Sequence, residues 1–477
     1  MQKVERSLVA VALRSQIFFL FFQFIVNPCP DLFNVFPPKS ADDMFRVNHE
    51  SNSSLDAVIH GLLGGFQTWD AQYYLFIAEF GYSIEKMFAF FPLFPLLIRT
   101  IASCIPLQSI MSFHTILTIS GLLINSVFFS LTAIFVYRFA KILTLNERIS
   151  ITSAHIFILN PARVFFVTNY TESMYSFLVF SAIYFWCVNN ALSVILFILA
   201  STTRANGIVN AGFFAHSLLS RAFGIPSRRL LSLSGIILCF LPFYQFQLFA
   251  YQTFCRMNFA IPKFPPPILS YILEFPNELL LPSTNSHPEW CFHRVPSVYR
   301  YIQQHYWENG FLNYYQFIKL PNFILASPVI FFSSYCILTY LKQIKLNILN
   351  LRIVIEPYFV HITHLAVLLI FAVTFMNIEV TTRFLFSSSP ILYVLLAKLL
   401  LPVEDGAYSC HFIDNFNKFC FTLFHFFGPH GSVLSASFIE SVVNTQSHCH
   451  IAKFFVFWCF LYTILGFLLH CNWYPWT

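Results

Sequence analysis

A short stretch near residue 70 carries two carboxylates, Asp70 and Glu79, among aromatic side chains. Long apolar segments flank the stretch, and a carboxylate so close to membrane-spanning sequence is costly unless it faces water, a partner or a substrate. The rings of Trp69, Tyr73 and Tyr74 beside Asp70 suit a sugar. We therefore interpret Asp70 as the acid or base of a membrane enzyme, and Glu79 as a hydrogen-bonding support. The alternative is that Asp70 only caps the start of a helix.

Three arginines that are far apart in the chain each lie beside a turn or a chain break, namely Arg163, Arg204 and Arg383. An arginine at a membrane surface often extends to the lipid headgroups, and this is the alternative for each of them. Three such residues on one face of the membrane indicate an anion site, because guanidinium groups hold phosphate through paired hydrogen bonds.

Two further polar residues accompany these arginines. Glu172 follows Tyr170-Thr171 at a predicted helix start, where the helix dipole favours a carboxylate, so both capping and a functional role are open. Asn206 belongs to Thr203-Arg-Ala-Asn-Gly207, which interrupts an apolar run. Capping or a hydrogen bond between helices is the alternative to substrate binding for Asn206.

Histidines and cysteines near the C-terminal end invite a zinc interpretation, but zinc fingers need a regular ligand spacing. None of the usual spacings fits the residues concerned, which are Cys410, His411, Cys420, His425, His430, His448, Cys449 and His450. We expect neither a metal nor a cofactor. Cys29, Cys255 and Cys291 fall in loops expected in the lumen, where a disulfide can form, although the sequence does not say which residues pair.

The composition excludes an ordinary soluble protein. The 477 residues are 57% hydrophobic and only 10% charged, with 62 phenylalanines and a mean hydropathy of +0.66. Soluble domains carry about 25% charged residues. A net charge of +6 without a concentrated basic patch gives no reason to expect nucleic-acid binding. The sequence therefore predicts a polytopic α-helical membrane protein.

A membrane-crossing helix needs about 20 apolar residues. Such runs lie near 8–26, 113–137, 150–168, 173–188, 191–219, 230–254, 321–341, 354–376, 384–401 and 453–471. The run at 191–219 is interrupted, and the shorter runs are open to tilted or re-entrant paths, so we expect about 8–11 transmembrane helices. The first run is expected to be an uncleaved anchor, because no small-residue cleavage site follows it. The apolar stretch Phe88–Ile105 suggests a helix lying along the membrane.

Lysine and arginine favour the cytoplasmic side, which sets the orientation. With a cytoplasmic N-terminus, one topology places the three most basic short connections inside, near residues 138–148, 221–229 and 342–352. The opposite, luminal face then receives the carboxylates, arginines and Asn206 described above. Polar groups from distant segments thus converge on one side of the membrane.

We expect a single membrane domain over 1–477, with a first luminal loop at 27–112 that holds Asp70. A second luminal loop at 255–320 has no clear periodicity, and a variable loop at 402–452 is of uncertain side. Asn52-Ser-Ser54 is a glycosylation sequon, as a luminal loop allows. Asn169-Tyr-Thr171 is another, and we expect it to be unmodified because it sits against the membrane.

Several blocks of sequence follow one another along the chain, beginning with Trp69-Asp-Ala71, Phe76–Tyr82 and Phe88–Pro95. The later blocks are Asn160-Pro-Ala-Arg-Val-Phe-Phe, Tyr170-Thr-Glu-Ser173, Thr203–Gly207, Thr382–Pro390 and the Trp-Tyr-Pro-Trp-Thr ending. In this order they resemble the PIG-V family, the glycosylphosphatidylinositol (GPI) mannosyltransferases that add the second mannose. The segments 255–320 and 402–450 diverge from the family.

The resemblance implies a GT-C glycosyltransferase in the endoplasmic reticulum membrane, with dolichyl-phosphate mannose as the donor and a GPI glycolipid as the acceptor. Such enzymes place a catalytic carboxylate in the first luminal loop, and Asp70 occupies that place. This family lacks the paired-Asp metal motif of some relatives, and here Ala71 and Gln72 follow Asp70.

The expected mechanism is transfer with inversion. Asp70 accepts the proton of the acceptor hydroxyl, and Arg204 or Arg383 stabilises the leaving phosphate. Trp69 and Tyr73 stack on the sugars. Glu79, Arg163, Glu172 and Asn206 complete the expected substrate-binding set.

The sequence leaves two other functions open. One is a different mannosyltransferase that uses dolichyl-phosphate mannose, acting at another GPI step or on protein. The other is a transporter, since polar groups at helix breaks also bind carried solutes. A transporter predicts two related halves, and we find no repeat. The sequence also leaves open a small accessory membrane subunit.

Overall fold

The computed structural model describes residues 3–26, 54–222, 229–256, 287–344, 354–401 and 449–476. These residues form helices and short 3-10 turns, and none of them lies in a strand. The sequon at Asn52, the cysteine Cys29 and residues 402–448 of the variable loop lie outside the described residues. So do the side chains of all the histidines and cysteines considered for zinc.

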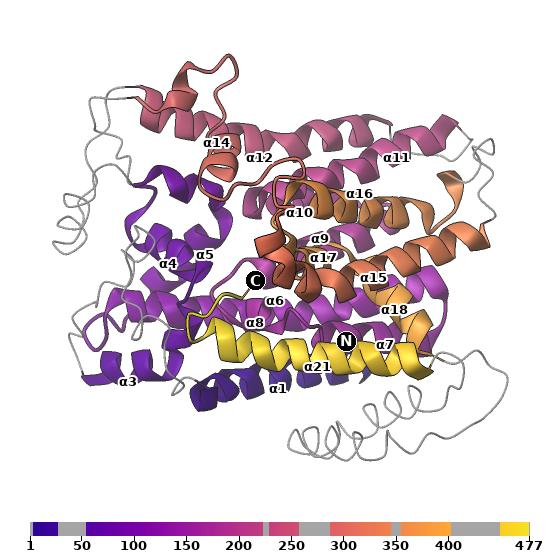
Figure 1. Cartoon of the computed structure of the whole chain (residues 1–477), viewed down its shortest axis with the longest axis horizontal. Coiled ribbons are helices and arrows are strands. Elements are labelled where there is room, and N and C mark those ends of the chain that lie inside the picture. The colour runs from indigo at the N-terminus through magenta and orange to yellow at the C-terminus, as the bar shows by residue number, and fades with distance from the viewer. Residues whose placement is uncertain are drawn as a thin grey trace.

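Most of the described helices run side by side in one bundle (Figure 1). α6 packs against α1, α7 and α9, and α12 packs against α10 and α11. The bundle helices are α1 (Lys3–Val26), α6 (Phe113–Thr144), α7 (Glu147–Ile158), α9 (Glu172–Cys187), α10 (Leu192–Thr203), α11 (Ala211–Ala222), α12 (Arg229–Cys255), α15 (Leu320–Gln343), α16 (Phe359–Phe375), α18 (Pro390–Leu400) and α21 (Cys449–His470).

Five helices among the described residues, α1, α6, α12, α15 and α21, are long and apolar enough to cross a membrane. A sixth crossing follows if α17 (Thr381–Ser388) and α18 count as one broken span. α10 and α16 are apolar but shorter. The described helices confirm the expected all-α polytopic class. They give fewer long crossings than the predicted 8–11, because several of the apolar runs are divided into short helices.

Two of these runs are broken at a proline. The run expected at 150–168 ends its first helix at Ile158 and resumes after Pro161 as α8 (Arg163–Val167). The run expected at 384–401 bends by 90° between α17 and α18, at Ser389. Ser389 has an extended backbone (φ −130°, ψ 100°), as expected of the residue before Pro390. Each break leaves an arginine, Arg163 or Arg383, in a short helix.

Three short helices, α3 (Ser54–Leu63), α4 (Asp70–Phe80) and α5 (Leu93–Cys104), gather at one end of the bundle, at the left of Figure 1. α14 (Val298–His305) packs on the 3-10 turn η3 (Glu85–Ala89) and on α12. A disulfide between Cys255 and Cys291 ties the end of α12 to the segment that precedes α14. The structure thus supplies the pairing that the sequence left open.

Candidate active site

The start of α4 is fixed by its neighbours. Trp69 occupies the N-cap position with φ 56°, a conformation that costs energy in any residue but glycine and recurs at functional sites. The backbone N–H of Asp70 donates to Tyr170 Oη at 3.0 Å. At the other end of α4, Arg99 Nη1 donates to the carbonyl oxygens of Ala78 and Glu79. Because Trp69 holds the N-cap position, capping alone does not account for Asp70.

The carboxylate of Asp70 is paired with Arg383. Arg383 Nη1 donates to Asp70 Oδ2 at 3.0 Å, and the Asp70 side chain keeps 32% of its surface exposed. The guanidinium of Arg383 lies 4.9 Å from the ring centre of Phe165 and 5.5 Å from that of Tyr170. Such contacts favour a cation over an aromatic face. The break at Ser389 gives α17 the course that brings Arg383 to α4.

A second, deeper carboxylate joins two arginines. Glu172, the first residue of α9, is 1% exposed, and its Oε1 lies 2.6 Å from Arg204 Nη1 and 3.9 Å from Arg383 Nη1. Arg204 sits where α10 gives way to the 3-10 turn η4 (Ala205–Asn210). That turn needs Gly207, because a Cβ there would lie 2.5 Å from the Cα of Ser201. The motif around Asn206 therefore places one guanidinium beside Glu172.

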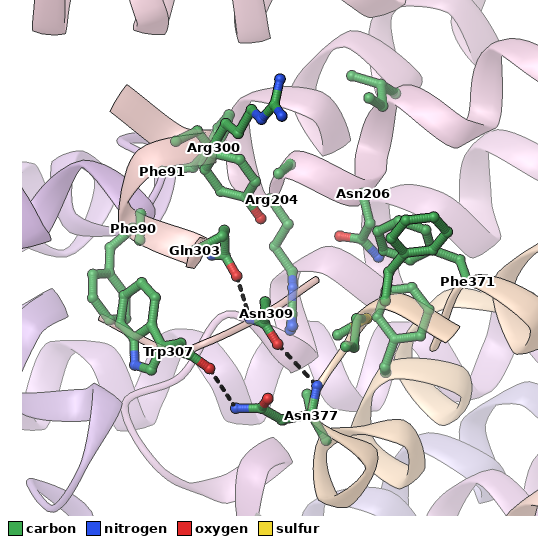
Figure 2. Close-up of a pocket in the computed structure, with 18 of the residues that line it drawn as sticks. Phe90, Phe91, Arg204, Asn206, Arg300, Gln303, Trp307, Asn309, Phe371 and Asn377 are labelled. Atoms are coloured by element: carbon green, nitrogen blue, oxygen red, sulfur yellow. Dashed lines mark hydrogen bonds between the residues drawn. The ribbon is translucent and has the colours of Figure 1, made fainter. Parts of the chain in front are cut away.

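These charges border a cavity of about 780 Å³, within the usual range for ligand sites. Asp70, Arg204, Asn206 and Arg383 line it, and Figure 2 shows Arg204 and Asn206 among the lining side chains. Asn206 Nδ2 donates to Ser388 Oγ at 3.0 Å, which joins η4 to α17. Four of the predicted site residues thus come together from three distant parts of the chain.

The two aromatic residues predicted to stack on sugars, Tyr73 and Trp69, are packed against other rings. Tyr73 is stacked on Phe90 with ring centres 4.6 Å apart, and it is 5% exposed. Trp69 lies 5.9 Å from Trp473, near the C-terminal end of the chain. Of these residues, Phe90 lines the cavity, whereas Tyr73 and Trp69 do not. A stacking role for Tyr73 and Trp69 stays a prediction.

Glu79 and Arg163 are placed away from the cavity lining. Glu79 Oε2 lies 2.9 Å from His114 Nδ1, which fits the expected supporting role. Arg163 is 1% exposed, donates to Ser15 Oγ at 3.1 Å and lies over the ring of Phe129 at 3.7 Å. Because α8 points this side chain toward α1 and α6, Arg163 does not join the other two arginines.

Sequence reasoning did not identify a hydrogen-bonded support behind Asp70. His470, at the end of α21, lies 3.1 Å through Nδ1 from Thr68 Oγ1 and 3.1 Å through Nε2 from Tyr170 Oη. Tyr170 in turn accepts the N–H of Asp70. The last helix therefore holds the start of α4 in place. A separation of 402 residues between Thr68 and His470 leaves no signal in the sequence.

The position of Asn169 supports the expectation that the sequon Asn169-Tyr-Thr171 carries no glycan. Its side chain is fully buried, and a Cβ on Gly121 would overlap its Oδ1. A side chain so enclosed has no room for a glycan, so the sequon Asn169-Tyr-Thr171 is expected to be unmodified.

The fold and the site define an integral-membrane protein whose cavity, at helix breaks, combines a partly exposed carboxylate with two guanidinium groups. That combination suits the transfer chemistry of an anionic, sugar-bearing substrate. Residues 5–477 match the family described as Mannosyltransferase (PIG-V). The chain belongs to the PIG-V mannosyltransferase family and is a glycosyltransferase, which favours the enzyme over the transporter.

Individual relatives agree with this membership. The chain is 33% identical over 481 residues to GPI alpha-1,6-mannosyltransferase 2 of Homo sapiens, covering 94% of each protein. It is 26% identical to GPI mannosyltransferase 2 of Drosophila melanogaster, covering 98% of each. Among solved structures, the oligosaccharyltransferase of Archaeoglobus fulgidus in the apo form is a weaker match, with 12% identity and a TM-score of 0.43. That match covers 97% of this chain and 55% of the other.

Proposed function

We propose that the protein transfers the second mannose, in α-1,6 linkage, from dolichyl-phosphate mannose to the GPI precursor, in the endoplasmic reticulum membrane. The family and the names of its similar relatives support the reaction and the acceptor. The distribution of basic residues in the sequence supports a cavity that faces the lumen. The observation that carries the chemistry is the pairing of Asp70 with Arg383 at the cavity.

Asp70 acts as the general base in this proposal. It accepts the proton from the 6-hydroxyl of the acceptor mannose as that oxygen attacks the anomeric carbon of the donor. The new glycosidic bond forms as the bond between that carbon and the phosphate oxygen breaks, with inversion. The exposed part of Asp70 gives the proton a path to water afterwards.

The arginines act on the leaving group. Dolichyl phosphate leaves as an anion, so it needs positive charge at the oxygen that departs rather than a general acid. A guanidinium has five N–H donors in a planar fork, so Arg204 and Arg383 keep donors for phosphate while each contacts a carboxylate. Glu172 holds the two guanidinium groups at one place. The scheme requires no metal ion.

Asn206 and two supporting residues complete the assignment. Asn206 lines the cavity within reach of a sugar hydroxyl, and its bond to Ser388 fixes its orientation. We assign Glu79 and Arg163 to support of the fold, since their partners are His114 and Ser15.

Complementation tests the proposal. The chain is expressed in cells that lack their own enzyme for the second mannose, and GPI-anchored protein at the surface is measured by flow cytometry. The wild-type chain should restore the signal, and Asp70→Asn should not, although it is made and retained in the same membrane. The cells without the chain should accumulate a GPI lipid with one mannose. Failure of the wild-type chain to restore the signal, or persistence of the one-mannose lipid in cells that express it, would overturn the proposal.

A further inference from the structure

One wall of the cavity comes from a segment that the mechanism above does not use. It consists of Gln303, Gln304, Trp307 and Asn309, from α14 and the turn after it. We call these four residues the α14 wall. Its side chains are neutral amides and an indole. Arg300, also on α14, lines the cavity as well, and the other charged groups of the site lie on α4, at the end of α10 and on α17.

Two amides of the α14 wall, Gln303 and Asn309, are joined to Asn377 in a connected row of hydrogen bonds (Figure 2). Asn309 Nδ2 donates to Gln303 Oε1 at 2.6 Å, and the N–H of Asn377 donates to Asn309 Oδ1 at 2.9 Å. Asn377 Nδ2 donates to the carbonyl oxygen of Trp307 at 3.3 Å. Gln303 Nε2 is then a donor, and the exposed Gln304, which also lines the cavity, carries both a donor and an acceptor. Sugar hydroxyls need both kinds of partner.

The α14 wall is preformed, because residues of the first loop contact the segment that carries it. The buried Glu85 accepts hydrogen bonds from Trp290 Nε1 and, at 3.0 Å, from Tyr306 Oη. The neighbouring Lys86 places its ammonium 5.6 Å from the ring centre of Tyr306 and 5.7 Å from that of Trp307. A preformed wall lowers the entropic cost of binding a flexible glycan.

The side of the cavity opposite the α14 wall carries exposed apolar side chains. Phe371 and Phe375, from the largely apolar α16, line it and are 46% and 42% exposed. Such a surface suits a lipid chain and offers nothing to hydroxyl groups. Figure 2 shows Phe371 across the cavity from Gln303 and Trp307. We therefore place a lipid chain of the substrates on the side of Phe371 and Phe375.

We propose that the α14 wall binds the glycan of the acceptor glycolipid, with Gln303 donating to a hydroxyl and Trp307 stacking on a sugar ring. This inference rests on the proposed function and names the subsite for its acceptor. The donor mannose and its phosphate lie instead at Arg204 and Arg383. The α14 wall orients the acceptor so that its reacting hydroxyl meets Asp70.

The test uses full-length purified protein, a short synthetic GPI acceptor and polyprenyl-phosphate mannose, with KM measured separately for each substrate. Gln303→Ala and Trp307→Ala should each raise the KM for the acceptor about five- to tenfold, in line with one lost hydrogen bond or stacking contact. The KM for the donor should stay within about twofold. Trp307→Phe should recover most of the acceptor affinity, because it keeps a ring.

The matched control is Gln316→Ala, in the same loop but outside the cavity lining. It should behave as wild type, and a thermal unfolding scan of each variant identifies any that do not fold. An unchanged acceptor KM in folded Gln303→Ala and Trp307→Ala would overturn the inference, as would a rise in the donor KM alone. A wild-type protein that transfers no mannose to the GPI acceptor would instead overturn the proposed function, so the two failures are distinguishable.

Discussion

Arg383 Nη1 lies 3.0 Å from Asp70 Oδ2, although 313 residues separate the two in the chain. The same nitrogen lies 3.9 Å from Glu172, which contacts Arg204 at 2.6 Å. The four side chains form one row in which carboxylate and guanidinium alternate. In the proposed reaction, the exposed end of the row receives the proton and the two guanidinium groups receive the phosphate.

The shape of the Arg383 side chain, and not only its charge, should be needed. Arg383→Lys keeps one positive charge but loses the planar fork that contacts Asp70 and a phosphate together. We expect kcat/KM for the donor to fall about 10- to 100-fold, in line with one or two lost charge-assisted hydrogen bonds. The control is Arg138→Lys, because Arg138 pairs with Glu5 away from the cavity. Equal rates for the two variants would contradict the role given to Arg383.

Glu172 should matter first for stability. Glu172→Gln removes the negative charge between two largely buried guanidinium groups, and breaking a buried ion pair costs about 3–5 kcal/mol. Denaturation in detergent should show this loss. Glu147→Gln is the control, since Glu147 and Lys141 are each nearly half exposed and water screens such a pair, which then contributes little to stability. A Glu172 variant as stable as the Glu147 variant would show that the pairing is not structural.

The sequence predicted the all-helical class and the family, because composition and ordered motifs are local properties of the chain. It also predicted that Asp70, Arg204, Asn206 and Arg383 share one side of the membrane, since the loops follow from the order of the spans. It could not say that Arg163 turns away, because the direction of α8 depends on packing against α1 and α6. The support from His470 depends on tertiary contact in the same way.

Glu85 predicts a pH dependence. Burial raises the pKa of Glu85 above its ordinary value of 4.5, an effect that the hydrogen bonds from Trp290 and Tyr306 only partly offset. The folded protein therefore binds this proton more tightly than the unfolded chain does. The stabilising contribution is fully present below pH 4.5 and is lost as the pH rises through the raised value.

The comparison with Glu85→Gln isolates this group, because glutamine does not titrate. The Tm of the glutamine variant minus that of wild type should increase as the pH rises above 4.5 and then level off. Parallel Tm curves for the two proteins would rule out a raised pKa at Glu85.

The disulfide should stabilise the second loop. The bond joins α12 to the segment before α14, across a sequence separation of 36 residues. For a loop of this length, the reduced entropy of the unfolded chain predicts about 3–4 kcal/mol of stabilisation. Cys255→Ser, Cys291→Ser and the double variant should lose the same stability, and the acceptor KM should rise because the α14 wall loosens. Cys104→Ser, at an exposed unpaired cysteine, is the control. Alkylation of Cys255 and Cys291 in the wild-type protein without reductant would show that the bond does not form.

The most direct measurement of the central claim is the turnover of purified Asp70→Asn with donor and acceptor at saturation. Asparagine keeps an oxygen for Arg383 but cannot accept the proton, so we expect turnover to fall about 10²- to 10⁴-fold while the donor is still bound. A folded Asp70→Asn enzyme with turnover close to wild type would contradict the assignment of Asp70 as the base.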